Sequence, residues 1–387
     1  MKVKNFLSDI LGIVRIIYRR NKAYKNAPGD KIPSDPIAKT AKALHPGKIK
    51  ATIVRIEEEK ADSKRICFHS EELPLFLSGT YLTVELSIDD SILTRPYSIV
   101  SEPHSSYKKK EVEIIVKERK EGVVSSYLCN KAKVGDEVTL EVGLGDFHYT
   151  PFRDSRHIVA IAGGVGITPF LSMAKDIVDN DLDLNLTILY GSVDSKGIIA
   201  EEELNSLVGD KVKVIHVISG DEAYQGEKGF IDEAIIKKYS PVEATYFLCG
   251  PKKMIESVMK ELSKMNVDTR KVRYESFPIE DISSCKGYDA SIKNKAFDIE
   301  VRIGHSINHI KAKAKESIAT ALERAGIKIH TCCRCGKCGA CRIKVIEGNY
   351  FIPKENDHRR EADKEFNYVY SCSTYPISDL IIKIDAI

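Results

Sequence analysis

The sequence predicts a multidomain protein: an antiparallel β-barrel, then an α/β domain with a parallel sheet, then a small α+β domain. Residues 47–150 hold short β-branched runs separated by polar turns, which is typical of antiparallel strands. Residues 151–279 alternate apolar strand patterns with helical patterns, which indicates a parallel sheet. Residues 297–387 combine strand patterns, one helix and a cysteine-rich loop. The polar residues 280–296 are predicted to link the last two domains.

The composition agrees with several folded cores and names no partner. The chain has 387 residues, of which 43% are hydrophobic and 30% charged, so bulk disorder is not expected. Its 59 Lys and Arg residues nearly balance 56 Asp and Glu residues, so no nucleic-acid partner is expected. No run reaches the roughly 18 uncharged apolar residues of a membrane span, and no signal peptide is recognisable. We expect a cytoplasmic protein, either free or peripheral to the membrane.

Residues 1–46 are predicted to form an amphipathic helix and a connector. Phe6, Ile10 and Ile17 recur at helical spacing, several basic residues follow them, and the next twenty residues are rich in Pro and Gly. Residues 5–25 have three possible contacts: the protein's own surface, a groove of a partner protein, or an anionic membrane surface. Docking on its own fold is the default for a terminal helix.

The cysteine loop has the spacing of an iron-sulfur site. Cys333, Cys338 and Cys341 follow the pattern C-x4-C-x2-C, and Cys372 lies thirty residues further on. Zinc sites also use paired cysteines, but the second C-x2-C pair that they usually show is missing. The cysteine loop and the residues around Cys372 resemble plant-type [2Fe-2S] ferredoxins, and the resemblance covers residues 297–387. It implies a β-grasp fold with these four cysteines as ligands. Cys332, Cys335 and an H-x3-H pair, His305 and His309, are interpreted as non-ligands.

Two further motifs lie in the predicted barrel. Arg95-Pro96-Tyr97-Ser98 ends one strand, and a turn that begins at Gly122 opens a short helix. A guanidinium suits a phosphate, an aromatic ring suits packing on a flavin, and the turn offers N–H groups to a pyrophosphate. Together they resemble the flavin-binding motifs of the ferredoxin-NADP reductase family. The flavin-binding residues that this resemblance implies are Arg95, Pro96, Tyr97, Ser98, Gly122, Val123, Ser125 and Ser126.

The parallel-sheet domain carries two motifs of the same family. The segments Gly163-Gly164-Val165-Gly166-Ile167-Thr168-Pro169 and Cys249-Gly250-Pro251 each follow a strand and open a helix, where backbone can approach a phosphate. They resemble the NAD(P)-binding half of ferredoxin-NADP reductases. That resemblance implies that Cys249 lies beside the nicotinamide and Glu275 near the flavin, so that Ser98, Cys249 and Glu275 are the candidate catalytic residues. The other implied cofactor-binding residues are Gly163, Gly164, Gly166, Thr168, Pro169, Gly250, Pro251 and Phe277.

Acidic residues after two strands of this domain favour NADH over NADPH. Asp194 and Asp221 stand where a 2′-phosphate would need Arg or Lys, although Lys196 and Lys228 are close in sequence. The order of the three domains resembles the reductase components of oxygenase systems and the reductases of hybrid-cluster proteins. This implies an enzyme that passes electrons from NADH through a flavin, FAD rather than FMN, to a [2Fe-2S] cluster and then to a separate acceptor protein. Two alternatives stay open: an electron-transfer subunit that is reduced by a partner, and a redox-sensing scaffold.

Overall fold

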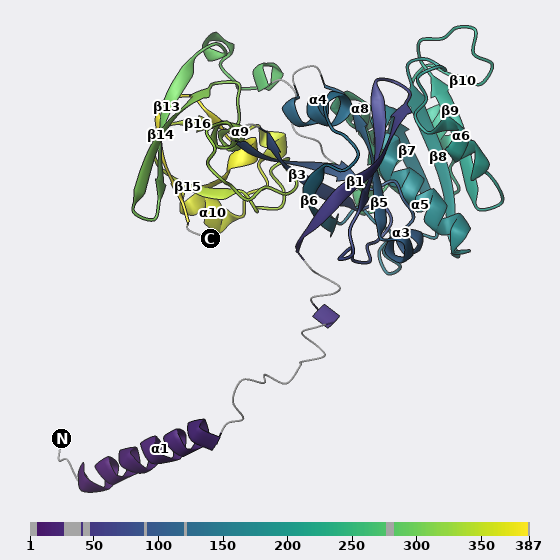
Figure 1. Cartoon of the computed structure of the whole chain (residues 1–387). Helices are drawn as coiled ribbons and strands as arrows, with labels where there is room; N and C mark the ends of the chain where they lie inside the picture. The colour runs from purple at the N-terminus through teal and green to yellow at the C-terminus, as the bar shows by residue number, and fades with distance from the viewer. Residues whose placement is uncertain are drawn as a thin grey trace. The chain divides into compact units, whose positions relative to one another are not determined.

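The computed structural model describes residues 6–26, 40–41, 47–88, 91–119, 122–275 and 282–385. The chain divides into two compact units, residues 1–46 and residues 47–387. In the first unit, helix α1 (Phe6–Asn26) has the expected helical structure and is drawn in purple in Figure 1. Within the described residues, no helix combines the length and apolar character needed to cross a bilayer.

The second unit begins with a six-stranded antiparallel sheet in the order β4-β3-β6-β1-β2-β5. Its two edge strands approach each other through an isolated bridge between Ile99 and Ile114, so the sheet closes into the expected barrel. Alternate residues of each strand fill the interior, including Ile53, Phe68 and Leu82. The elements are β1 (Lys48–Glu59), β2 (Ser63–His69), β3 (Tyr81–Ile88), β4 (Ser91–Ser98), α3 (Pro103–Lys109), β5 (Glu111–Lys117), α4 (Val123–Asn130) and β6 (Glu137–Leu144).

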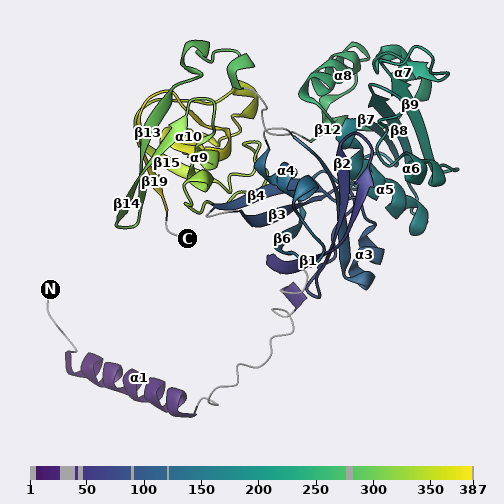
Figure 2. The same cartoon turned by 45° about the horizontal axis from the view of Figure 1, so that its top comes forward.

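A parallel sheet in the order β10-β9-β8-β7-β11-β12 follows. Ile158 and Ala160 of β7 pack with residues of α5 and α6, whereas Val159 and Ile161 pack with residues of α7 and α8. Helices therefore cover both faces of the sheet, as Figure 2 shows. The elements are β7 (His157–Gly163), α5 (Thr168–Asp179), β8 (Asn185–Ser192), α6 (Glu201–Ser206), β9 (Val212–Ile218), β10 (Glu227–Lys228), α7 (Glu233–Tyr239), β11 (Thr245–Cys249), α8 (Lys252–Lys264) and β12 (Val272–Tyr274).

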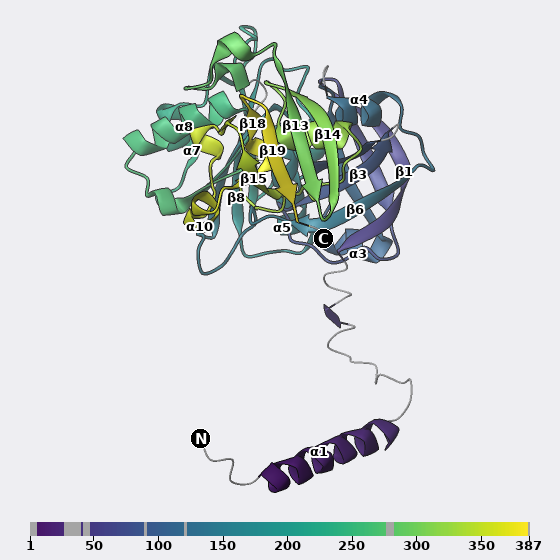
Figure 3. The ribbon, with the colours of Figure 1, turned by 90° about the vertical axis from the view of Figure 1, so that its left-hand side faces the viewer.

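The C-terminal domain is a mixed five-stranded sheet in the order β14-β13-β19-β15-β17. Strands β13 and β19 pair in parallel and the other pairs are antiparallel; β13, β14 and β19 run side by side in Figure 3. Helix α9 packs Ile318 and Leu322 against the sheet. The elements are β13 (Ala296–Ile303), β14 (Ser306–Lys313), α9 (Ile318–Arg324), β15 (Arg342–Glu347), β16 (Tyr350–Phe351), α10 (Glu361–Glu365), β17 (Tyr368–Tyr370), β18 (Tyr375–Pro376) and β19 (Leu380–Ile384).

The fold class predicted from the sequence is thus confirmed, whereas the domain boundaries stay a prediction. Residues 280–296, expected as a polar linker, contain two short 3-10 turns, Ile282–Ser284 and Ala290–Ile292. Ile282, Tyr288 and Ile292 are buried in one small cluster with Tyr375 of the C-terminal domain. A few well-spaced apolar residues are therefore enough to pack this segment onto that domain.

An aromatic cluster joins the barrel to the parallel-sheet domain. Phe147 follows β6, and its ring centroid lies 5.8 Å from that of Phe170 and 5.2 Å from that of Phe247. All three rings are buried in the core of the parallel-sheet domain. Packing of this kind fixes the relative position of two sheets that share no strand.

We predict that Phe147→Ala will lower stability by about 3 to 5 kcal/mol, because it leaves a cavity between the two domains. Phe152→Ala is the matched control, since Phe152 is fully exposed only five residues later, and it should change stability by less than about 0.5 kcal/mol. Thermal unfolding followed by circular dichroism measures both. Equal midpoints for the two variants would contradict the assignment of Phe147 to the interdomain core.

Candidate active site

One cavity of about 370 Å³ collects residues from all three domains of the second unit. The barrel contributes the end of β4, the parallel-sheet domain contributes the residues after β12, and the C-terminal domain contributes the cysteine loop. Parts of the chain more than 200 residues apart in sequence thus face one space. Its lining consists of Tyr81, Pro96, Tyr97, Ser98, Gly145, Asp146, Phe147, Tyr274, Glu275, Cys333, Cys335, Lys337 and Cys338.

The three candidate catalytic residues are brought together: Ser98 and Glu275 line this cavity, and the fully buried Cys249 lies behind them. The Ser98 hydroxyl donates to Glu275 Oε2 at 3.3 Å, and the Cys249 thiol lies 3.8 Å from the same oxygen. The backbone N–H of Glu275 donates to Leu248 O, which holds Glu275 beside the end of β11. Burial raises the pKa of Glu275 to about 7 and raises that of the Cys249 thiol as well. A carboxyl group that can hold or release a proton near neutral pH therefore stands next to a hydroxyl and a neutral thiol.

The first flavin motif is divided between the cavity and the domain interface. Pro96, Tyr97 and Ser98 line the cavity. Arg95 instead ion-pairs with Glu323 of α9, at 3.1 Å. Arg334, from the cysteine loop, donates to the same carboxylate at 2.6 Å. One buried carboxylate thus lies between two guanidinium groups, which leaves one net positive charge beside the cavity, and a flavin phosphate fits that charge.

The second flavin motif opens α4 as expected. Gly122 is the N-cap, and no side chain caps the helix, so its first-turn N–H groups can serve a phosphate. A Cβ at Gly122 would lie 2.5 Å from Ser125 Oγ, so any larger residue there would displace this hydroxyl. The Ser125 hydroxyl donates to Gly122 O and accepts from Arg119 N, and Ser126 donates to Glu118. Both hydroxyls therefore shape the turn in addition to any role in binding.

The two glycine motifs of the parallel-sheet domain lie side by side. Strands β7 and β11 pair in parallel with Ala162 opposite Cys249, so the loops that follow them meet at the same edge of the sheet. A Cβ at Gly166 would lie 2.2 Å from Cys249 O, and only glycine allows the two loops to approach so closely. The Thr168 hydroxyl donates to Val165 O rather than capping α5. Gly163, Gly164, Pro169, Gly250 and Pro251 lie at this edge too, whereas Phe277 lies outside the described residues.

The four predicted ligand cysteines form two pairs. Cys338 N donates to Cys333 Sγ at 3.4 Å, and Cys372 N donates to Cys341 Sγ at 3.5 Å. None of the four is in a disulfide. Gly336 and Gly339 have φ values of +80° and +74°, which lets the loop turn around the thiols. Two thiol pairs, held by one loop and a distant turn, suit a centre with two irons.

The cysteine loop also holds residues that sequence reasoning did not assign to the site. Cys332, interpreted as spare, places Sγ 3.1 Å from the Tyr81 hydroxyl of the barrel. Lys337 lies over the ring of Tyr274, 4.4 Å from its centroid. Arg334 and Glu323 were missed because a lone Arg and a helical Glu carry no motif. Arg334 lies between two predicted ligands in the sequence, and this position was the signal that could have identified it. Its backbone has a left-handed conformation.

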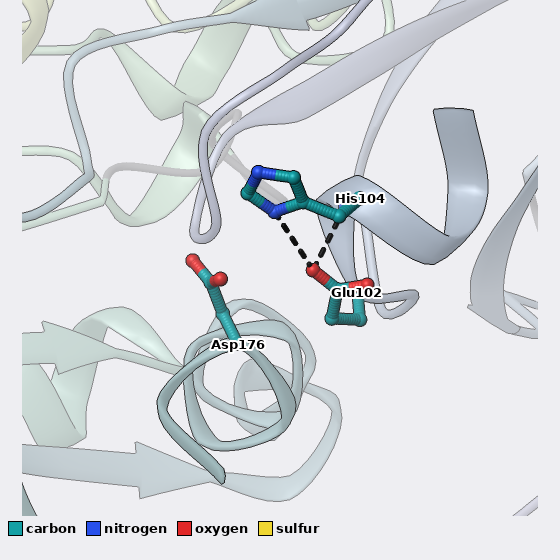
Figure 4. Close-up of side chains that lie close together, drawn as sticks. All are labelled: Glu102, His104 and Asp176. Atoms are coloured by element: carbon teal, nitrogen blue, oxygen red, sulfur yellow. Dashed lines mark hydrogen bonds and ion pairs between the residues drawn. The ribbon is translucent and has the colours of Figure 1, made fainter. Parts of the chain in front are cut away.

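Glu102, His104 and Asp176 form a second cluster of potential ligands, away from the cavity (Figure 4). Glu102 caps α3 by accepting from His104 N and Ser105 N, and it also accepts from Asn180 at 2.7 Å. Asp176 accepts from Ser78 at 2.7 Å. These hydrogen bonds tie the barrel to α5, so the cluster is a structural contact between domains.

Three family models match separate parts of the chain. The oxidoreductase FAD-binding domain matches residues 50–149, the oxidoreductase NAD-binding domain residues 160–260, and the 2Fe-2S iron-sulfur cluster binding domain residues 303–376. The FAD, NAD and [2Fe-2S] cofactors indicated by the motifs are therefore confirmed.

Relatives match most of the chain. The glycine betaine monooxygenase reductase subunit of Chromohalobacter salexigens is 26% identical over 356 residues, which cover 87% of this chain and 95% of that protein. The carnitine monooxygenase reductase subunit of Escherichia coli is 27% identical over 296 residues, covering 76% and 83%. Among solved structures, phthalate dioxygenase reductase has a TM-score of 0.65 at 22% identity and covers 88% of this chain and 98% of its own. The similarity to phthalate dioxygenase reductase is a similarity of fold.

We predict that Glu275→Gln will flatten the pH dependence of stability. Because the pKa of Glu275 is raised in the folded protein, its contribution is greatest below its unfolded pKa of about 4.5 and is lost as the pH rises through about 7. Urea unfolding of the wild type should therefore show a falling midpoint across this window, and the variant should not. Glu222→Gln, at an exposed position, should keep the wild-type profile; a matching profile for Glu275→Gln would contradict the burial of this carboxyl group.

We predict that Cys338→Ser will abolish the iron-sulfur cluster while flavin reduction by NADH continues, because the flavin and nucleotide motifs lie in other domains. Iron and acid-labile sulfide are measured per chain on anaerobically purified protein. Cys332→Ser is the control and should retain two irons and two sulfides, since Cys332 does not fit the ligand spacing. Stoichiometric zinc without sulfide in the wild type would rule out the cluster.

Proposed function

The chain belongs to the ferredoxin-NADP reductase family and carries a C-terminal [2Fe-2S] ferredoxin domain, and we propose that it is an NADH-dependent reductase that delivers electrons to an oxygenase component. The chain carries electrons from a nicotinamide nucleotide through its flavin and its cluster to a separate acceptor protein. One observation carries this assignment: most of the first flavin motif, Glu275 and two predicted cluster ligands line the same cavity. Electrons can pass between two centres that share one cavity without a change of fold.

When bound, the flavin takes up two electrons with a hydride, and the iron-sulfur centre passes electrons on one at a time. The chain's own residues prepare this exchange. Tyr97 and Pro96 supply an apolar wall to the cavity, and the buried ring of Phe147 lines it as well. Ser98 and Cys249 both hydrogen-bond to Glu275, so they orient this carboxyl group, which holds a proton near neutral pH.

Two observations support an oxygenase as the acceptor. The relatives that cover most of the chain are named as reductase subunits of monooxygenases. Cys338 is an exposed residue, so one predicted cluster ligand reaches the protein surface, where an acceptor can approach.

An anaerobic stopped-flow experiment with the isolated chain tests this function. Mixing with NADH should bleach the flavin first and then reduce the cluster, followed by its absorbance and electron paramagnetic resonance signal. If the chain only receives electrons from a partner complex, its flavin should stay oxidised after mixing with NADH. A redox-sensing scaffold would be reduced without turnover when an artificial acceptor dye is added.

The preference for NADH rests on the carboxyl ends of two neighbouring strands. Strands β8 and β9 pair in parallel up to Ser192 and Ile218, so the loops carrying Asp194 and Asp221 lie next to each other. The Asp221 side chain accepts from Ser195 Oγ at 2.9 Å. The nearby Lys228 donates to Glu222 O, which directs its ammonium group into its own loop.

We predict that NADH will reduce the flavin roughly ten to a hundred times more efficiently than NADPH, because a charge-assisted contact to the 2′-phosphate is missing. Asp221→Arg should narrow this ratio by supplying that contact. Asp210→Arg is the matched control, because Asp210 lies just before β9, at the opposite end of the strands, and it should leave the ratio unchanged. Faster reduction of the wild type by NADPH would refute the proposed preference.

A further inference from the structure

Helix α1 exposes an unusual amount of apolar surface. Ile10, Leu11, Ile13, Val14, Ile16, Ile17 and Tyr18 are all between 40% and 67% exposed. Exposed large apolar residues are ordinary when scattered, but here seven occur within nine residues of one helix. Exposing this apolar surface to water is unfavourable, so we expect another surface to cover it.

Most apolar residues of α1 share one broad face, and most of its basic residues border that face. At about 100° per residue, Ile13, Ile17, Ile10, Val14, Tyr18 and Leu11 follow one another around a single broad face. Lys22, Arg15 and Arg19 lie along one edge of that face, and Arg20 lies along the other. Ile16 lies beyond Arg20, and Lys25 lies in line with the face but past its end at Tyr18. Long basic side chains at the edges of an apolar face can keep their charges in the head-group layer while the face enters the bilayer.

The shape of this face favours a lipid surface over a protein groove. A coiled-coil partner would require a narrow stripe repeated over at least three heptads, whereas this broad face ends near Tyr18, and basic residues prevail from Arg19 to Lys25. The helix contains five basic residues and one acidic residue, Asp9. This number of basic residues on an amphipathic helix is typical of helices that bind anionic lipids.

We propose that α1 binds the surface of an anionic bilayer and so concentrates this reductase at a membrane. This inference goes beyond electron transfer and does not depend on the identity of the acceptor. The helix lies in the plane of the surface, with Ile13 and Ile17 in the acyl region and its arginines at the phosphates.

Vesicle co-sedimentation of the full-length, cofactor-loaded protein tests the proposal. The protein should sediment with vesicles of phosphatidylcholine and phosphatidylglycerol at least tenfold more than with phosphatidylcholine alone, and salt should weaken this binding. Ile13→Asp with Ile17→Asp, and separately Arg19→Glu with Arg20→Glu, should abolish it. Val242→Asp is the control, because it makes the same kind of change at an exposed apolar residue outside α1, and it should bind normally.

If α1 binds another surface, the experiments give different results. If α1 is protected from hydrogen exchange in the absence of vesicles, it docks on the protein's own fold. If vesicles of both compositions fail to bind while deletion of residues 1–30 still weakens electron delivery to the acceptor, it docks on a protein. Either result overturns the membrane proposal, and neither affects NADH oxidation with a dye.

A second inference concerns Glu323, and it rests on the proposed function. Its carboxylate is only 2% exposed and is contacted by Arg95 of the barrel and Arg334 of the cysteine loop. Arg334 also reaches Thr94 O, at 3.5 Å, and its neighbour Cys332 contacts Tyr81. The ligand Cys333 therefore stands between two residues that are both held against the barrel.

We infer that Glu323 is a positioning residue that holds the cysteine loop against the flavin cavity. Removing one partner of a buried ion network leaves the other charges uncompensated, so Glu323→Gln should favour separation of the ferredoxin domain from the barrel. The iron ligands are untouched by this change, and so are the residues that meet the nucleotide.

Two measurements on the full-length, loaded protein test this role. In Glu323→Gln, amide exchange in residues 318–324 and 91–98 should rise, and the rate of cluster reduction should fall at least tenfold relative to the rate of flavin reduction by NADH. Glu323→Asp should restore part of the protection from amide exchange and part of the rate of cluster reduction. Glu316→Gln is the control, since Glu316 pairs with Arg324 inside the same domain.

Unchanged exchange and unchanged cluster reduction in Glu323→Gln would overturn this inference. Failure of the proposed function looks different, because the flavin of the wild type would then not be reduced by NADH. Iron content and the resonance spectrum of the reduced cluster verify that the variant keeps its metal centre.

Discussion

The arrangement of this molecule depends on one buried ion network, in which Glu323 binds Arg95 and Arg334. Each arginine belongs to a different cofactor motif, one to the flavin and the other to the iron-sulfur loop. A desolvated carboxylate with two partners has little freedom to exchange them for water, because each guanidinium would be left uncompensated. The network therefore fixes the distance between two redox sites that are carried by separately folded domains.

Further contacts between the domains reinforce this arrangement. The rings of Phe147, Phe170 and Phe247 join the barrel to the parallel-sheet domain through apolar packing, and the hydrogen bonds of Glu102 and Asp176 tie the barrel to α5. Cys332 and Tyr81 join the barrel to the cysteine loop. The flavin barrel is thus held from two directions, and its cavity opens where both neighbours meet it. A nucleotide can approach from one neighbour while electrons leave through the other.

The cavity also explains why residues with weak motifs belong together. Ser98, Cys249 and Glu275 come from β4, the end of β11 and the residue after β12, and no spacing rule connects them. Burial at the meeting point of these elements raises the pKa of Glu275 toward neutrality. A resemblance to a known family identified these residues, but only the fold gives the physical reason for their chemistry.

The sequence by itself determined the three domains, their order and the four cysteine ligands as candidates. Strand and helix periodicity, glycines at strand ends and cysteine spacing are local properties, and they can be interpreted without knowing what is distant in the chain. Only the tertiary structure decided the partners of Arg95, the contact of Cys332 with Tyr81, and the packing of residues 282–292. These depend on residues brought together from distant parts of the chain, and a buried charge or thiol takes its role from the neighbours that exclude water from it.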